Sequence, residues 1–175
     1  MNLDGYVACI CEGSAEQAIM DLLLEADKLI FNTDMLLEGE IIRCRGGKSF
    51  ESRYLRKGFK EKIIILRILD SRRENFKLSK AYAEKIEVIN IITAPEIEML
   101  IILNENKYED FKKSGEKPSV YCKTKLNYKD VKSYTFVKNY FGDVTILIKS
   151  IKEYKRVSNV KNSEYTLYDL LREKL

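Results

Sequence analysis

Polar residues suited to magnesium and phosphate chemistry follow four apolar stretches of this sequence. Glu12 and Glu16 bracket the turn after the first stretch. Two carboxylates this close repel each other unless a cation or a proton lies between them. Mg²⁺ binds one or two carboxylates and keeps waters for a phosphate substrate. The pair therefore predicts a magnesium-binding turn, and the alternative is that Glu16 only stabilises the N-terminus of a helix through the helix dipole.

Two glycines and a lysine, Gly46-Gly47-Lys48, follow the second stretch. Glycine lets backbone N–H groups approach an anion closely, and the lysine adds a positive charge. The segment is not a Walker A loop, because Ile42 occupies the position of the first glycine of that motif. It predicts a turn that contacts phosphate, although two glycines before a helix are also compatible with a simple turn.

Asp70 directly follows the third stretch, residues 63–69, which is almost continuously apolar and is typical of a strand covered on both faces. An aspartate at the carboxyl end of such a strand is placed to bind a metal ion, or it is only a turn residue. The fourth stretch, residues 87–93, is followed by Glu96 and Glu98, which are further candidate ligands.

The elements that must position these residues are strands that alternate with amphipathic segments. This alternation predicts an α/β fold with a mainly parallel sheet and helices on both faces. Open α/β sheets bind ligands at the carboxyl ends of their strands, so all four turns are expected at one edge. The expected strands are residues 5–11, 40–44, 62–69 and 87–93.

Helices are expected between and after these strands. A capping box of Ser14 and Gln17 is expected to start the first helix. The sequence predicts helices over residues 14–26, 49–57, 78–85 and 96–103, and in the tail over 128–140, from Asp143 to about residue 156, and over 165–174. A turn-rich break at residues 113–118 separates the parts, which predicts an α/β domain at 1–110 and a helical extension at 111–175 packed on it.

Composition indicates a globular protein. The chain has 175 residues, 45% of them hydrophobic and 33% charged. No apolar run approaches the ~20 residues that span a bilayer, and the start lacks the pattern of a signal peptide, so we expect no membrane partner and a cytoplasmic location. The four cysteines form no CxxC pair and the chain has no histidine, which favours buried reduced thiols over a zinc site.

Positive charge is concentrated in two parts of the chain. Residues 1–110 hold 16 Lys and Arg against 20 Asp and Glu, whereas residues 111–175 hold 15 against 7. Within residues 43–60 seven cations face one acid. This distribution predicts nucleic-acid binding, and the alternative is a lysine-rich surface that only maintains solubility. The candidate contacts to nucleic acid are Gly46, Gly47, Lys48, Arg53, Arg56, Lys57 and Arg72.

The turn from Glu12 to Glu16, Gly46-Gly47-Lys48 and Asp70, in this order, resemble the topoisomerase–primase (Toprim) domain. The nearest resemblance is to the nucleases of the OLD family and to small RloB-type proteins associated with phage defence, over residues 5–103. The resemblance implies a Rossmann-like sheet and phosphodiester cleavage that depends on Mg²⁺ or Mn²⁺. Glu12 would act as acid, base or metal ligand, Asp70 would bind metal, and the glycine turn would contact phosphate.

The chain departs from this family after the third strand, where an Asp-x-Asp pattern is expected and Asp70-Ser71-Arg72 stands. The second carboxylate is absent, so one metal ion or none fits better than two. One hypothesis is a nuclease with Glu12, Lys48 and Asp70 as catalytic residues and with Glu12, Glu16 and Asp70 as metal ligands. The alternatives are a nucleic-acid-binding protein without catalysis and a subunit of a larger defence complex, for example beside an ATPase.

Overall fold

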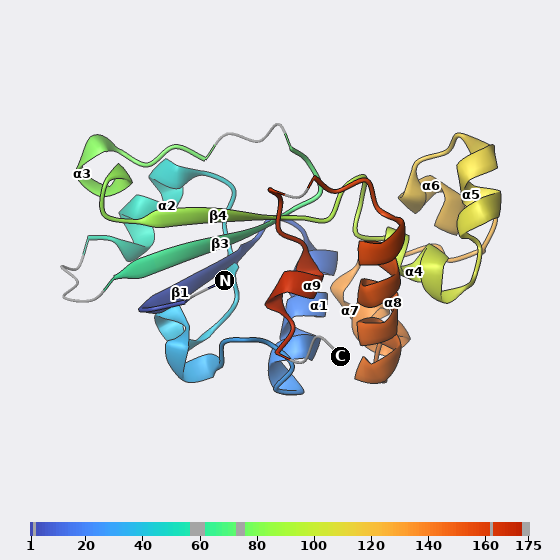
Figure 1. Ribbon diagram of the computed structural model, residues 1–175, viewed down its shortest axis with the longest axis horizontal. Coiled ribbons are helices and arrows are strands. Elements are labelled where there is room, and N and C mark those ends of the chain that lie inside the picture. The colour runs from blue at the N-terminus through green and yellow to red at the C-terminus, as the bar shows by residue number, and fades with distance from the viewer. Residues whose placement is uncertain (2, 57–61, 73–75, 162, 173–175) are drawn as a thin grey trace.

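The computed structural model describes residues 1, 3–56, 62–72, 76–161 and 163–172. Its centre is a parallel sheet of four strands in the order β2-β1-β3-β4, with helices packed around it (Figure 1). The strands are β1 (Tyr6–Cys11), β2 (Ile42–Arg43), β3 (Ile63–Leu69) and β4 (Glu87–Ile92). The predicted α/β class and the mainly parallel sheet are confirmed.

The two central strands run in register over six pairs, from Tyr6 beside Ile63 to Cys11 beside Ile68. All seven residues of β3 are buried, as its continuous apolar sequence predicts. Because β1 and β3 end side by side, Glu12 and Asp70 emerge at the same edge of the sheet. The edge predicted from the sequence is therefore present.

Helices surround the sheet and fill the tail. They are α1 (Ser14–Glu25), α2 (Gly47–Tyr54), α3 (Lys80–Ala83), α4 (Met99–Asn104), α5 (Tyr108–Ser114), α6 (Pro118–Thr124), α7 (Tyr134–Tyr140), α8 (Val144–Val157) and α9 (Leu167–Leu170). Two short 3₁₀ turns, Thr33–Met35 and Leu37–Gly39, lie between α1 and β2. In the described part of the chain, no helix combines the length and apolar character needed to cross a bilayer.

Alternating side chains of the strands supply two separate hydrophobic cores. Val7, Cys9 and Ile64 belong to a core shared with α1, α4 and the helices of the tail. Ala8 and Ile65 belong to a smaller core that includes Phe50 of α2. Figure 1 shows α2 and α3 on one side of the strands and α1 and α9 on the other, which confirms helices on both faces.

Several predicted helix boundaries were wrong, because local hydrogen bonds decide where the helices begin. The caps of α1, α7 and α9 are Gly13, Ser133 and Thr166, and α1 has no side-chain capping bond, so the predicted capping box of Ser14 does not form. The Ser133 hydroxyl accepts from the Phe136 N–H at 3.1 Å and starts α7 six residues later than predicted. Residues 96–98 form i→i+3 turns before α4 begins.

The tail is more helical than predicted and contributes to the larger core. Helices α5 and α6 flank the predicted break at residues 113–118 and were both missed. Leu147 and Ile151 of α8 and Leu167 of α9 belong to the same core as α1. The Ile92 N–H also donates to the carbonyl of Tyr165 at 2.7 Å, which ties the tail to the outer edge of β4.

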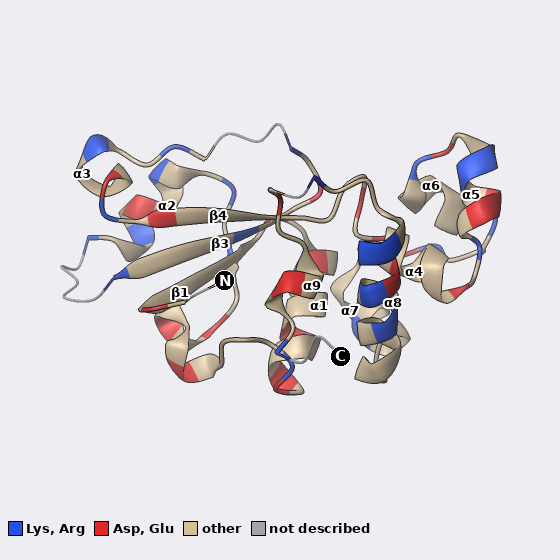
Figure 2. Ribbon diagram, viewed as in Figure 1, with Lys and Arg blue, Asp and Glu red and all other residues tan. Residues whose placement is uncertain are grey.

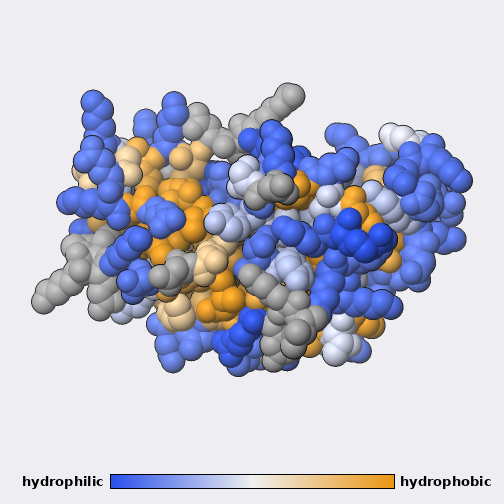
Figure 3. Space-filling view, viewed as in Figure 1, coloured by the Kyte–Doolittle hydropathy of each residue, from blue (hydrophilic) through white to orange (hydrophobic). Residues whose placement is uncertain are grey.

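Apolar residues also reach the surface over the strands (Figure 3). Tyr6 of β1 and Val88 of β4 are 38% and 36% exposed. The surface over α5 and α8 in the same view is mainly polar.

The two glycines before α2 differ in their surroundings. A Cβ atom on Gly47 would lie 2.1 Å from the carbonyl oxygen of Lys77, whereas nothing lies within 4 Å of a Cβ atom on Gly46. The chain at Lys77 therefore passes so close to Gly47 that a side chain cannot fit. This packing accounts for Gly47 without reference to phosphate.

We predict that Gly47→Ser lowers the free energy of unfolding by about 1–3 kcal/mol, because the new side chain displaces the backbone of Lys77. Gly46→Ser is the matched control and should change it by less than about 0.5 kcal/mol, since serine is a favourable helix cap in open space. Urea unfolding of both variants measures the difference. Equal losses would contradict the packing explanation.

Candidate functional site

A pocket of about 420 Å³ lies where the strands end. Its lining comes from the ends of β1 and β3, the start of α1, the segment after β2, the turn before α4 and the connection between α6 and α7. The lining residues are Glu12, Gly13, Ser14, Ala15, Glu16, Arg45, Ile68, Asp70, Glu98 and Lys132. The pocket thus unites the three carboxylates predicted as metal ligands, Glu12, Glu16 and Asp70.

Glu12 is held by a buried arginine. The Arg67 Nη2 atom donates to Glu12 Oε1 at 2.9 Å, and the two side chains are 2% and 17% exposed. The guanidinium carbon of Arg67 lies 4.7 Å from the centre of the Phe76 ring, within the range of a cation–π contact. Our sequence interpretation assigned no role to Arg67. The sequence did hold a clue to this role, because Arg67 is the single charged residue within the apolar run of β3.

Glu16 stands in the first turn of α1 and is buried. Burial raises the pKa of its carboxyl, and a hydrogen bond from the backbone opposes this rise. The charge of Asp70 adds a smaller increase, which the charges of Lys132 and Arg43 oppose. The repulsion expected between acids of this edge therefore acts between Glu16 and Asp70. A Cβ atom on Gly13 would lie 2.2 Å from Glu16 Oε2, so the glycine leaves room for this carboxylate beside the turn.

Glu98 and Lys132 complete the pocket. Glu98 is 3% exposed, and burial raises the pKa of its carboxyl to about 7. Lys132 Nζ lies 3.1 Å from Glu96 Oε1, and the Ser119 N–H donates to the other oxygen of Glu96 at 2.8 Å. Burial alone would raise the pKa of Glu96, but these hydrogen bonds outweigh it and lower the pKa. Glu96 and Glu98 were candidates from the sequence, whereas Lys132 was missed because it comes from the tail.

The candidate nucleic-acid residues divide into three groups. Gly46, Gly47, Lys48, Arg53 and Arg56 lie on or beside α2, where the three cations are exposed and do not line the pocket. In this region Arg45 is the cation that reaches the pocket lining. Figure 2 shows basic residues near α2 and along α8.

Arg72 and Lys57 form the other two groups. Arg72 binds the carboxylate of Glu164 with two hydrogen bonds of 2.7 and 3.1 Å and does not line the strand-end pocket. Arg72, which stands where a second carboxylate was expected, therefore contacts the tail. Lys57 lies outside the described residues.

The pocket could supply only a small number of protein ligands to a metal ion. Among the described residues, no group of three or more His, Cys, Asp or Glu side chains is arranged to hold a metal ion. Mg²⁺ needs only one or two carboxylates when waters complete its shell. Glu12, Glu16 and Asp70 line the same pocket and could supply these carboxylates, and Glu12 is also bound to Arg67.

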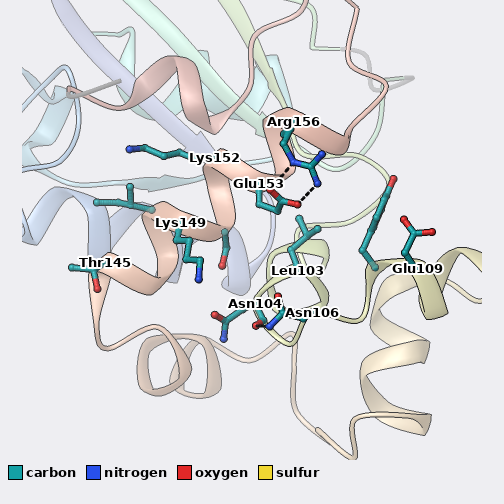
Figure 4. Close-up of a pocket in the computed structure, with 12 residues that line it drawn as sticks. Leu103, Asn104, Asn106, Glu109, Thr145, Lys149, Lys152, Glu153 and Arg156 are labelled. Carbon is teal, nitrogen blue, oxygen red and sulfur yellow. Dashed lines mark hydrogen bonds and ion pairs between the residues drawn. The ribbon is translucent and has the colours of Figure 1, made fainter. Parts of the chain in front are cut away.

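A second, larger cavity of about 750 Å³ lies between α8 and the connection from α4 to α5 (Figure 4). Asn104, Asn106 and Lys149 are part of its lining. Arg156 and Glu153 in its wall bind each other, with hydrogen bonds of 2.8 and 2.5 Å. It contains none of the site residues predicted from the sequence.

Comparison of the chain with protein-family models, with curated proteins and with solved structures gives no match.

We predict that Glu98 makes stability depend on pH. Its pKa of about 7 in the folded protein lies above the ordinary value of 4.5, so the folded state binds more protons than the unfolded state between these values. Stability should therefore fall as the pH rises from about 4.5 to about 7, by up to about 3 kcal/mol. Glu98→Gln should remove this fall and be the more stable protein at about pH 8.

Urea unfolding of the wild type and Glu98→Gln at about pH 5 and about pH 8 tests this. Glu84→Gln, an exposed glutamate next to α3, is the control and should keep the wild-type pH dependence. If Glu98→Gln loses stability with pH as the wild type does, another group is responsible.

Proposed function

We propose that this protein is a Mg²⁺-dependent phosphodiesterase that cleaves nucleic acid. One observation carries the proposal: four carboxylates, Glu12, Glu16, Asp70 and Glu98, line one strand-end pocket together with the cations Arg45 and Lys132. Acids packed this closely and partly buried oppose one another unless cations bind them. The resemblance of Glu12 to Glu16, of the glycine turn and of Asp70 to the Toprim domain supports the same assignment.

Glu16 and Asp70 are the residues that we propose as ligands of the Mg²⁺ ion. Burial raises the pKa of Glu16 and the charge of Asp70 adds to this rise, and a cation between the two carboxylates would favour their ionised forms. When bound, such an ion supplies a Lewis acid for the phosphate and a more acidic water. Mn²⁺ has similar ligand preferences and should bind at the same residues.

The other side chains of the pocket provide proton transfer and charge. Glu98, whose pKa is about 7, exchanges a proton readily at neutral pH, as a general base requires. Lys132 and Arg45 attract the phosphate and stabilise negative charge that develops on it. Glu12, held as a carboxylate by Arg67, contributes charge to the pocket rather than a proton. Lys48 would contact the nucleic acid outside the pocket.

Nucleic acid is the substrate that fits the distribution of charge. Arg45 lines the pocket, and the exposed cations on or beside α2 follow it in the sequence. A phosphate backbone bound to these cations could extend toward the pocket. The basic tail supplies further positive charge, with 15 Lys and Arg against 7 Asp and Glu in residues 111–175. These features support nucleic acid over a small uncharged substrate.

A second candidate function is binding without cleavage, either to nucleic acid or as a subunit of a defence complex with an ATPase. The observation that favours it is the Glu12–Arg67 ion pair, which already neutralises one of the carboxylates predicted to be catalytic. The exposed cations of α2 would serve such a role without a metal ion. Metal binding separates the two candidates.

We predict that Mg²⁺ and Mn²⁺ at millimolar concentration raise the Tm, because binding to the folded state alone shifts the equilibrium by mass action. Asp70→Asn should abolish this rise and leave the metal-free protein folded, since it removes one of the two proposed ligands. Asp34→Asn is the control, an exposed aspartate in a 3₁₀ turn. A wild-type Tm indifferent to both metals would leave the second candidate in place.

Cleavage is measured in the same conditions on fluorescent single- and double-stranded DNA and RNA. We expect activity only with added metal and a fall of at least ~100-fold in Asp70→Asn and Glu98→Gln. Metal binding without cleavage of any of these substrates would contradict the phosphodiesterase assignment.

We predict that binding to nucleic acid weakens steeply with salt, because counterions return to the phosphates. Arg53→Glu/Arg56→Glu on the α2 side should reduce the affinity by at least ~10-fold and flatten the salt dependence. Lys112→Glu/Lys113→Glu on α5 makes the same change of charge far from α2 (Figure 1) and is the control. Equal losses in the two variants would show that net charge, not the α2 surface, determines binding.

A further inference from the structure

The strand-end pocket has its cations at the rim and its acids deeper inside. Arg45 and Lys132 line it and are exposed to solvent. Two of the acids in its lining, Glu16 and Glu98, are only 8% and 3% exposed. The lining also includes Ile68, a fully buried residue of β3. The pocket therefore leads from a basic rim down to the hydrophobic core, and a phosphate reaches the buried acids only by entering it.

Contacts with the core fix the side of the rim that comes from the tail. Lys132 Nζ lies 3.1 Å from Glu96 Oε1, and Val131, its neighbour in the chain, is fully buried in the larger core. Ser133 is the cap of α7, and Val137 of this helix belongs to the same core. The wall that carries Lys132 is thus held on both sides of this residue. We therefore expect the entrance to keep its width when a substrate arrives.

The size of the pocket suits a flexible strand and excludes a stiff duplex. Its volume of about 420 Å³ is in the lower part of the range of sites that enclose small ligands. A double helix is too wide for such a pocket, since its major groove alone measures about 12 Å, and it is stiff over lengths of about 150 base pairs. Its phosphates therefore stay at the rim. An unpaired strand bends and rotates about its backbone bonds, so it can carry a phosphate inward.

We propose that the strand-end pocket selects unpaired strands, so that a single-stranded segment of DNA or RNA enters it and a duplex does not. The inference rests on the proposed function and names its class of substrate. The proposed metal ligands, Glu16 and Asp70, belong to the lining of this pocket. Only a strand that enters the pocket brings a phosphodiester to them.

Selection takes place at entry and not at the outer surface. Lys48, Arg53 and Arg56 are exposed on or beside α2 and do not line the pocket. Such cations contact the phosphates of single strands and of duplexes alike. A nucleotide must leave a duplex before it can enter the pocket, which costs unpairing and unstacking energy. We therefore expect both forms to bind and only the unpaired form to be cleaved rapidly.

Cleavage of a hairpin compares the two forms within one molecule. The substrate is a DNA or RNA stem with an unpaired loop at one end and unpaired tails at the other, incubated with the wild-type protein and millimolar Mg²⁺. Cuts should map to the loop or the tails, and bonds of the stem should be cut at least ~10-fold more slowly. A smaller difference would overturn the inference and leave the proposed phosphodiesterase in place. Cleavage of no part of the substrate would overturn both.

Filling the pocket tests entry by a second route. Ser14 begins α1 and lines the pocket, and Ser14→Leu places a larger apolar side chain there. Cleavage of a linear single strand should fall at least ~10-fold, while its Kd, measured in EDTA, stays within ~3-fold of the wild-type value because the cations of α2 are unchanged. Ser79→Leu makes the same change at the exposed N-cap of α3 and is the matched control, which should keep the wild-type rate and Kd.

A wild-type rate of cleavage in Ser14→Leu would overturn the pocket as the place where the strand enters. A Kd that rises as much as the rate falls would also overturn it, because binding at the surface, and not entry, would then have been lost. The hairpin measurement uses the wild-type protein, so its result does not depend on the folding of Ser14→Leu.

Discussion

The parallel pairing of β1 and β3 is the constraint on which the site depends. Six consecutive pairs align the two strands, so both end at the same level. A slip of one residue would exchange the two faces of a strand and separate Glu12 and Asp70 from their present surroundings. The register is fixed by burial on both faces, because residues of β1 and β3 alternate between two cores. The geometry of the pocket is therefore a consequence of apolar packing below it.

The carboxylates at this edge of the sheet repel one another, although the packing of the strands brings them together. Glu16 and Glu98 are buried enough to have raised pKa values, and each carboxylate adds to the repulsion of the others. The fold tolerates this because cations are built in beside the acids, Arg67 at Glu12 and Lys132 at Glu96. Such a balance is typical of functional sites, where groups are kept in states that packing alone would not favour.

Sequence reasoning located what depends on local pattern and missed what depends on tertiary contact. The apolar runs of β1 and β3, and hence the shared edge with Glu12 and Asp70, were predictable from hydrophobic pattern alone. Lys132 was not, because only the docking of the tail brings it beside Glu96. The start of α4 was also misplaced, since Glu96 binds Ser119 and Lys132 across the chain, an arrangement that no helix propensity encodes. The Toprim resemblance stays a prediction.

The contact of Glu96 with the tail has a thermodynamic consequence. Its two carboxylate oxygens bind the Ser119 N–H and Lys132 Nζ, which belong to α6 and to the segment before α7. The docking of those segments therefore affects the charge in the pocket, because Lys132 also lines it. By reciprocity, a ligand that binds more tightly when Lys132 is in place also tightens the docking of the tail, by the same factor. The segments that carry Ser119 and Lys132 are in this sense coupled to the pocket as well as packed on the core.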